Sequence, residues 1–259
     1  MAPNTYRKLQ DKHVLVIGGS SGIGLAVAEG ALSSGANVTL SSSSLAKVEA
    51  AVTSLATKYP HLTVRGIVSD LSKPSVEGDL STLFKAAEST TTINHVVFTA
   101  ADSLSLGGLD AVTVDGIHKA AHMRFVVPVL LAKVAARYLP PSRLSSLTIT
   151  TGTVAQRPNK GWAVTSYFAG GLASLARALA VDLAPVRVNA VQPGFVDTGL
   201  WDYMGSEDKA VFVKALEEER TLTGKFASVE DVAEAYLWLL KDGNATGTVA
   251  GTDSGSLIV

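Results

Sequence analysis

Short apolar runs recur along this chain, and segments with a helical spacing of apolar residues lie between most of them. The runs have the length of buried strands and cover residues 13–17, 37–41, 63–68, 93–99, 146–151, 186–191 and 247–251. The helical patterns cover residues 23–34, 45–57, 79–87, 108–138, 165–183, 206–219 and 229–240. Pro128 lies inside the longest of these patterns and is expected to kink it. The alternation predicts a Rossmann-type α/β fold, a doubly wound parallel sheet with helices on both faces.

One domain is expected for residues 1–259, because no linker rich in proline, glycine or charge divides the chain. The rhythm of strands and helices is interrupted between residues 197 and 225, directly after a predicted strand. Open α/β sheets bind ligands outside the carboxyl ends of their strands, so this segment is predicted to form a substrate lid. Its acidic run at residues 217–219 is read more simply as a solvated helix face.

The amino-acid composition limits the kinds of molecule that this protein is expected to bind. The net charge of −1 supplies no basic field for nucleic acid or anionic lipid, and no apolar stretch is expected to span a bilayer. The expected partner is therefore a small-molecule substrate, with no nucleic acid and no membrane. The absence of cysteine excludes disulfides and thiolate nucleophiles, and the five scattered histidines have no metal-ligand spacing. The lack of an apolar N-terminal segment predicts a cytoplasmic protein.

A glycine-rich turn joins the first predicted strand to the first predicted helix. Its residues predicted to bind a cofactor are Gly18, Ser20, Ser21, Gly22, Ile23 and Gly24. Glycine allows a tight turn and a close approach of pyrophosphate to main-chain N–H groups, and the helix N-terminus adds partial positive charge. The order of strand, glycine loop and helix therefore predicts a dinucleotide-binding site.

The residues after the second predicted strand favour one dinucleotide over the other. An NAD-selective protein places a carboxylate there to bind the ribose 2′-hydroxyl, whereas this chain has Ser42, Ser43 and Ser44. These hydroxyls, with Lys47 one helical turn on, can hydrogen-bond a 2′-phosphate, so the predicted cofactor is NADP(H). The same serines also suit a cap for the following helix, and both readings can hold together.

With these motifs in this order, the chain resembles the short-chain dehydrogenase/reductase family over nearly its whole length. The resemblance implies that Asp70 and Leu71 contact the adenine and that residues 187–198 frame the nicotinamide. The further cofactor-binding positions that it implies are Ala100, Ala101, Pro193, Gly194, Val196 and Thr198. It also implies a homodimer or homotetramer formed through the helices predicted at 108–138 and 165–183.

The family's proton donor has no matching residue pair here. Members usually carry a tyrosine whose pKa is lowered by a lysine four residues later on the same helix. Alignment of residues 172–183 with that helix puts Thr165 at the tyrosine position and Ala169 at the lysine position. Tyr167 lies two residues away, a rotation of about 200° around a helix, so it is expected to pack or to lie at the rim.

Other positions around the expected nicotinamide face also depart from the family. Arg124 stands where a helix asparagine usually supports a proton-relay water. An arginine binds a carboxylate or an amide oxygen and stabilises negative charge, but it does not readily release its proton. The family's serine falls near Thr151 or Thr153, and either hydroxyl could bond a substrate oxygen. With Asp102 and Trp162, these residues form the predicted catalytic set.

Arg124 and Trp162 together resemble a fungal branch of the family that lacks the tyrosine and the lysine. This branch includes the reductases and Diels–Alder cyclases of bridged indole alkaloid pathways. In those cyclases an aspartate precedes the tryptophan by three residues, where this chain has Asn159. A neutral amide cannot accept a proton or pair with a cationic azadiene, which argues against cyclase chemistry. Trp162 is read either as a substrate-stacking residue or as a rim aromatic that packs on the lid.

Three functions are compatible with this pattern. The favoured one is an NADP(H)-dependent reductase whose substrate, an iminium ion or activated carbonyl of secondary metabolism, accepts hydride without a tyrosine proton. The second is a redox-neutral cyclase or isomerase in which bound NADP is a structural or electrostatic element. The third is a non-catalytic NADP(H)-binding protein that reports the dinucleotide to a partner.

Overall fold

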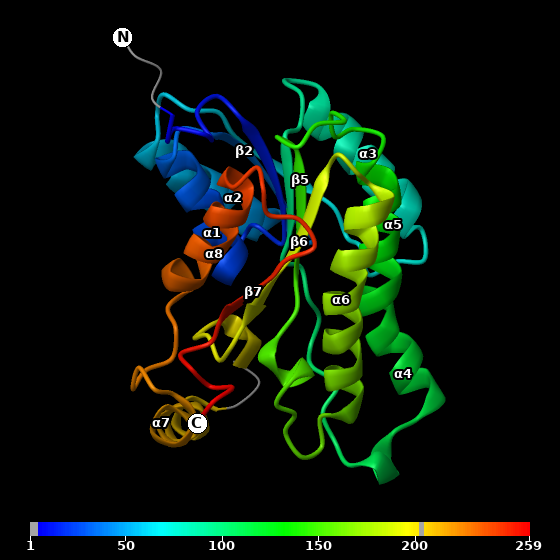
Figure 1. The fold of residues 1–259 in the computed structure, drawn as a ribbon, viewed down its shortest axis with the longest axis vertical. Coiled ribbons are helices and arrows are strands. Elements are labelled where there is room, and N and C mark those ends of the chain that lie inside the picture. Colours follow the sequence, from blue (N-terminus) through cyan, green and yellow to red (C-terminus); the bar gives the residue numbers. More distant parts are fainter. Residues whose placement is uncertain (1–4, 202–204) are drawn as a thin grey trace.

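The computed structural model describes residues 5–201 and 205–259, and in this part of the chain seven strands form one parallel sheet (Figure 1). The strands are β1 (His13–Ile17), β2 (Asn37–Ser42), β3 (Val64–Val68), β4 (His95–Phe98), β5 (Ser146–Thr150), β6 (Arg187–Pro193) and β7 (Val249–Thr252). Their order is β3-β2-β1-β4-β5-β6-β7, so the winding direction reverses between β1 and β4. In doubly wound sheets the ligand usually binds in a crevice at the carboxyl ends of the two strands that flank this reversal.

Helices cover both faces of the sheet. They are α1 (Gly22–Ser33), α2 (Leu45–Lys58), α3 (Val76–Glu88), α4 (Val114–Ala121), α5 (Val127–Ala135), α6 (Ala163–Asp182), α7 (Ser206–Arg220) and α8 (Val229–Lys241). One face carries α1, α2 and α8, and the other carries α3, α5 and α6 (Figure 1). The predicted doubly wound α/β fold is confirmed, and a hydrophobic cluster lies on each side of the sheet.

Each apolar run in the sequence overlaps a strand, and the central strands give the clearest runs because they are buried on both faces. All five residues of β1 and all four residues of β4 are buried. Strands of this kind read as nearly continuous apolar runs rather than as alternating patterns. The runs therefore predicted the strands well, with ends displaced by a residue or two.

The long helical pattern at 108–138 is not one kinked helix. It is divided into a 3-10 turn (Leu109–Ala111), α4, a π-helical turn (His122–Val126) and α5. Pro128 lies at the start of α5, where its missing N–H cannot bond the carbonyl of Arg124. The backbone hydrogen bonds change from the α-helical to the wider π-helical pattern just before the proline. Arg124 lies in the resulting π-turn.

The expectation that no segment could span a bilayer is wrong on length and composition. Within the described part of the chain, α6 is long and apolar enough to cross a membrane, with a mean hydropathy of 1.3. In this fold, however, α6 packs on β5 and β6, next to α5 (Figure 1). Packing on the sheet accounts for its buried apolar side chains, among them Phe168, Leu172 and Ala176.

The segment predicted as a lid contains α7 and a 3-10 turn at Gly199–Trp201, and residues 202–204 lie outside the described part. Phe195, in the loop after β6, stacks on Phe226 with ring centroids 5.4 Å apart. Phe212 of α7 meets Phe195 edge-on at 6.4 Å, and Lys209 of α7 forms an ion pair with Asp197 at 3.1 Å. These contacts dock α7 against the loop that follows β6.

Candidate functional site

The glycine turn lies in the crevice between β1 and β4. Gly18 has a φ of +91°, and a Cβ atom added to it would lie 2.8 Å from the Cα atom of Ala100. A Cβ on Gly24 would overlap the carbonyl of Gly18 and the hydroxyl of Thr99. The N–H of Gly18 donates to Ser41 O at 2.8 Å. Only glycine fits these two positions, and the turn is thereby pressed against the ends of β2 and β4.

The N-terminus of α1 and Thr198 meet in this crevice. Ser21 is the N-cap of α1 but makes no side-chain capping bond, so it leaves the first N–H groups of the helix without a side-chain cap. Thr198 lies next to the turn: a Cβ atom added to Gly22 would lie 3.5 Å from the Thr198 Cγ2 atom. N–H groups at a helix N-terminus together with a hydroxyl suit a pyrophosphate. The residues present therefore fit a dinucleotide.

The serines after β2 have a capping role. Ser44 accepts a hydrogen bond from Lys47 N at 3.4 Å and caps α2, and Ser42 Oγ accepts one from Ser44 N at 3.4 Å. The capping reading is thus confirmed for Ser44. Ser43 is exposed at the same corner. Binding of a 2′-phosphate by these hydroxyls remains a prediction.

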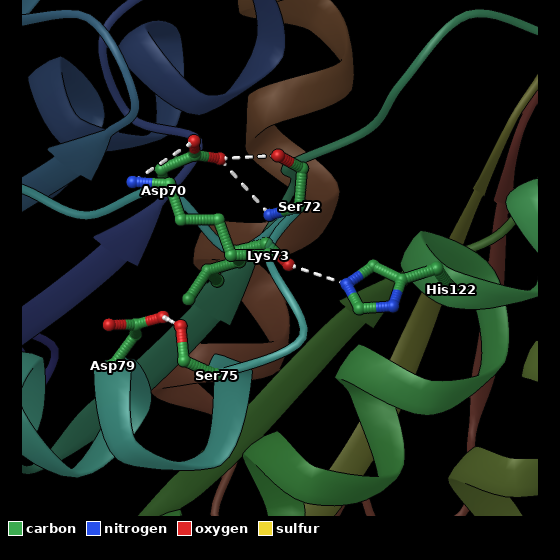
Figure 2. A network of polar contacts seen from close by, with 7 residues as sticks. Asp70, Ser72, Lys73, Ser75, Asp79 and His122 are labelled. Carbon is green, nitrogen blue, oxygen red and sulfur yellow. Dashed lines mark hydrogen bonds and ion pairs between the residues drawn. The ribbon is translucent and has the colours of Figure 1, made fainter.

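Asp70 and Leu71 follow β3 at the same edge of the sheet. The Asp70 carboxylate accepts hydrogen bonds from Ser72 Oγ at 2.6 Å and from Ser72 N at 3.1 Å, and Lys73 Nζ lies 3.7 Å from it (Figure 2). The hydrogen bonds from Ser72 are the main reason that the pKa of this carboxyl is lowered. Asp70 is therefore a fixed, charged acceptor at the corner where the adenine is predicted.

Arg124 and Asp102 form an ion pair beyond the end of β4. One Arg124 nitrogen binds the Asp102 carboxylate, and the other donates to Asp102 O at 3.0 Å and to Ser103 O at 3.1 Å. The Arg124 side chain is 11 % exposed and that of Asp102 is 30 % exposed. The guanidinium therefore holds the loop that leaves β4, and the carboxylate is the more accessible member of the pair. The sequence named both residues but did not predict that they pair.

Thr165 and Ala169, the positions that the sequence analysis assigned to the family's tyrosine and lysine, are both buried. Thr165 is 5 % exposed and donates to Ser105 O at 2.8 Å. Ala169 is 7 % exposed, and its carbonyl accepts the hydroxyl proton of Thr151 at 2.6 Å. Tyr167, in contrast, is 76 % exposed and lies edge-on to Phe168 with ring centroids 5.3 Å apart. In this chain the Tyr167 ring therefore faces outward rather than toward the crevice.

Thr153 and Trp162 flank the segment between β5 and α6. Thr153 begins a 3-10 turn, Thr153–Ala155, directly after Gly152. Trp162 is the partly buried N-cap residue of α6, and its backbone N–H donates to Asn159 O at 3.1 Å. Both residues therefore belong to the connection at the carboxyl end of β5, and their catalytic role stays a prediction.

The end of β6 supplies the remaining predicted cofactor positions. Pro193 is the last residue of β6, and the N–H of Gly194 donates to Thr252 O at 2.9 Å. A Cβ on Gly194 would lie 2.8 Å from the Cα of Asp253, so the two chain segments cross closely. Val196 is buried and forms an isolated bridge with Ala227. This packing fixes the position of the segment that connects the end of β6 to Thr198.

The contacts of two residues near the site were missed by sequence reasoning. His122 Nε2 lies 2.8 Å from Leu71 O and links the π-turn to the predicted adenine corner (Figure 2). Thr165 was noted only as a replacement, whereas its hydroxyl ties the start of α6 to the loop after β4. Among the described residues, no group of three histidines, cysteines or carboxylates could hold a metal ion.

A glycine turn at the switch point of a doubly wound sheet, with a helix N-terminus above it, defines a dinucleotide-binding protein. Comparison with known families agrees with this class, because the model described as SDR-like Rossmann domain matches residues 5–259. The chain belongs to the short-chain dehydrogenase/reductase (SDR) family of NAD(P)-dependent oxidoreductases.

Similar proteins are found among fungal members of the family. The short-chain dehydrogenase/reductase fsr5 of Gibberella fujikuroi is 39 % identical over 255 residues, which cover 97 % of this chain and 96 % of that protein. The solved structure of the MalC reductase/Diels–Alderase from Malbranchea aurantiaca is 38 % identical, with a TM-score of 0.93 over 99 % of this chain and 100 % of that one. A small-chain dehydrogenase in complex with NADPH is 25 % identical, with a TM-score of 0.77 over 96 % and 100 % of the two chains.

Proposed function

We propose that this protein is an NADP(H)-dependent reductase of a small secondary-metabolite electrophile, an iminium ion or an activated carbonyl. The observation that carries the proposal is the composition of the reaction centre. Thr165 and Ala169, which we align with the family's proton-donating pair, are buried and hydrogen-bonded to other backbone segments. The loop that Thr165 holds at Ser105 also carries Asp102, whose carboxylate is the more accessible member of its ion pair with Arg124. This centre suits an electrophile that is already positively charged.

The reaction with an iminium ion needs no proton donor. When bound, NADPH supplies a hydride, a C–H bond forms at the iminium carbon, and the C=N π pair moves onto nitrogen, which becomes neutral. Asp102, held by Arg124, would pair with the cation before transfer. The Thr151 hydroxyl has its own proton engaged with Ala169 O, so it can only accept a hydrogen bond from a substrate N–H.

The preference for NADP(H) is supported by the residues at the carboxyl end of β2. Residues 42–44 are serines, so no carboxylate is present there to repel a 2′-phosphate. The 25 % identical dehydrogenase was solved with NADPH. Equilibrium binding of NADPH and NADH to the purified protein tests this preference, and equal affinity for the two would contradict it.

The function is tested with purified protein, NADPH deuterated at the transferable C4 position, and a panel of cyclic iminium ions matched to the corresponding ketones. We expect NADPH oxidation and deuterium in the product for iminium substrates, with rates at least about 10²-fold above those of the ketones. Gly18→Ala serves as the control that removes the cofactor contribution. Simple ketones reduced as fast as iminium ions would contradict the preference for an activated electrophile. No oxidation across a panel that also includes activated carbonyls would refute the proposal.

A cyclase activity is favoured by one observation, the 38 % identity with a protein described as a reductase/Diels–Alderase. Asn159 weakens this second candidate, because an amide cannot act as an acid or a base. Turnover that proceeds equally with oxidised and reduced cofactor would establish a redox-neutral reaction. NADPH binding without any turnover, unaffected by Arg124→Ala, would favour the non-catalytic reading.

We also propose a homodimer or homotetramer formed through the face made by α4, the π-turn, α5 and α6. Large apolar side chains are exposed there: Val114 is 67 %, Phe125 58 % and Val181 77 % exposed. Only 28 % of the most apolar 18-residue stretch of α6 is buried within one chain. Sedimentation equilibrium tests this proposal, and Phe125→Glu is expected to shift the population toward the monomer.

A further inference from the structure

His122 bridges two parts of the molecule that are distant in sequence. Its Nε2 atom lies 2.8 Å from the backbone carbonyl oxygen of Leu71, a contact between residues 51 positions apart (Figure 2). Leu71 is 5 % exposed, so its carbonyl depends on a protein donor rather than on bulk water. Both the neutral Nε2–H tautomer and the protonated ring can supply that donor.

The predicted adenine corner lies at one end of this bridge. Leu71 directly follows Asp70, whose carboxylate is fixed by Ser72 and Lys73 (Figure 2). An adenine held at Asp70 and Leu71 would reduce the freedom of this loop. The bond to His122 transmits that restriction to the helical segment on which His122 lies.

The Arg124–Asp102 pair lies at the other end. His122 and Arg124 belong to the same π-helical turn, His122–Val126, and are two residues apart. Short π-helical turns are rare and occur mostly at functional sites, where the surrounding contacts maintain them. Arg124 in turn binds the Asp102 carboxylate and the carbonyls of Asp102 and Ser103. One five-residue turn thus joins the adenine corner to the loop that carries the accessible carboxylate.

We infer that His122 is a positioning residue that couples occupancy of the adenine corner to the placement of Arg124 and of the loop after β4. The inference rests on the proposed function, because it takes Asp70 and Leu71 as part of an NADP(H) site. It adds that the adenosine half of the cofactor orders the reaction centre through the protein, without contacting that centre.

The test uses adenosine 2′,5′-bisphosphate, which carries the adenine and the 2′-phosphate but no nicotinamide. Amide hydrogen exchange is followed in residues 102–107 with and without this probe. Any protection there arises through the protein, because the probe has no group that would reach the nicotinamide side. We expect the probe to slow exchange in this segment of the wild-type protein about threefold or more.

The variants separate the bridge from the bulk of the side chain. His122→Phe removes the donor, and His122→Asn keeps an amide that is too short to reach Leu71 O. In both variants the probe is expected to leave exchange in residues 102–107 unchanged and to bind about five- to tenfold more weakly. His122→Gln, whose Nε2 stands at the same number of bonds from Cα, is expected to restore the response. His118→Asn, on an exposed residue of α4, is the matched control and should behave as wild type.

The outcomes distinguish this inference from the proposed function. If NADPH does not bind the wild-type protein, the proposed function is wrong and the inference fails with it. If NADPH binds but the probe never protects residues 102–107, or protects them in His122→Asn and His122→Phe as strongly as in the wild type, the inference is wrong and the function stands. Loss of the response in His122→Gln as well would assign His122 a packing role and would also overturn the inference.

Discussion

The hydroxyl of Thr165 donates to the backbone carbonyl of Ser105 at 2.8 Å, and this bond joins the start of α6 to the loop that leaves β4. A backbone bond from Gly107 N to Gly161 O at 2.9 Å reinforces the same contact. Arg124 holds the same loop at Asp102 and Ser103. The Thr165 hydroxyl therefore stabilises the loop after β4, and its proton is engaged with Ser105 O.

Thr165→Val tests this relationship, because valine keeps the shape of threonine and removes only the hydroxyl. The carbonyl of Ser105 loses its donor, so we expect the free energy of unfolding in urea to fall by about 1 kcal/mol. Amide exchange in residues 105–107 should also become faster. Thr165→Ser, which keeps the hydroxyl, should retain the slow exchange. Equal exchange in the valine and serine variants would show that the hydrogen bond does not hold the loop.

Gly18→Ala is expected to abolish tight dinucleotide binding. The added Cβ would lie 2.8 Å from Ala100 Cα, and the φ of +91° is unfavourable for alanine, so the turn must move away from the end of β4. Calorimetric titration should show a loss of NADPH affinity of about tenfold or more. Gly78→Ala in α3, where nothing lies within 4 Å of the new Cβ, is the control and should bind NADPH normally. Unchanged affinity in Gly18→Ala would remove the turn from the cofactor site.

The strands, most helices and the glycine turn could be predicted from the sequence because each depends on local information. A parallel strand buried on both faces has a nearly continuous apolar sequence. A strand followed by a glycine-rich turn and a helix indicates a dinucleotide-binding site. The failure at residues 108–138 has a physical reason. A π-turn inserts an extra residue into a helix without changing its apolar character, so the pattern continues through the break at His122–Val126.

The long-range contacts around the candidate site could not be predicted in this way. The bonds from His122 to Leu71, from Arg124 to Asp102 and from Thr165 to Ser105 join residues 51, 22 and 60 positions apart. Helical and strand periodicity relate only neighbours along one element. A single sequence can single out Arg124 and Thr165 as candidates, but only the packed fold shows which groups they contact.

Stability should decrease in mild acid because of two buried histidines. Burial lowers the pKa of His95 to about 3, and burial also lowers the pKa of His13. Above a pH of about 6.5 the folded and unfolded states are both neutral at these residues, so the full stability is present. As the pH falls below about 6.5, the unfolded state binds protons that the folded state does not, and each histidine removes up to about 1.4 kcal/mol per pH unit.

His95→Asn isolates this contribution, since asparagine can replace the bond between His95 Nδ1 and Ser146 Oγ at 2.9 Å. Urea unfolding at pH values of about 7 and about 5 should show a loss of stability that is smaller by roughly 2 kcal/mol in the variant than in the wild type. The carboxylates contribute equally to both proteins and cancel in this comparison. An identical loss in the two proteins would mean that His95 is protonated in the folded state.

Arg124→Lys should reduce turnover more than it reduces cofactor binding. Lysine keeps the positive charge but has a single nitrogen, which cannot bind the Asp102 carboxylate together with the carbonyls of Asp102 and Ser103. We expect kcat for an iminium substrate to fall about 10- to 100-fold, while the KM for NADPH changes by about twofold or less. Steady-state kinetics with each substrate varied in turn provides the measurement.

The same experiment decides whether Arg124 and Asp102 act as one unit. If Arg124 works by holding the Asp102 carboxylate against the substrate cation, Asp102→Asn removes the same interaction, and the double variant should be little worse than either single variant. Lys133 and Glu77, an exposed ion pair at 2.6 Å, supply the control cycle, and their removal should leave kcat unchanged. Additive losses for Arg124→Lys and Asp102→Asn would show that the two residues contact the substrate independently, with the arginine binding it directly.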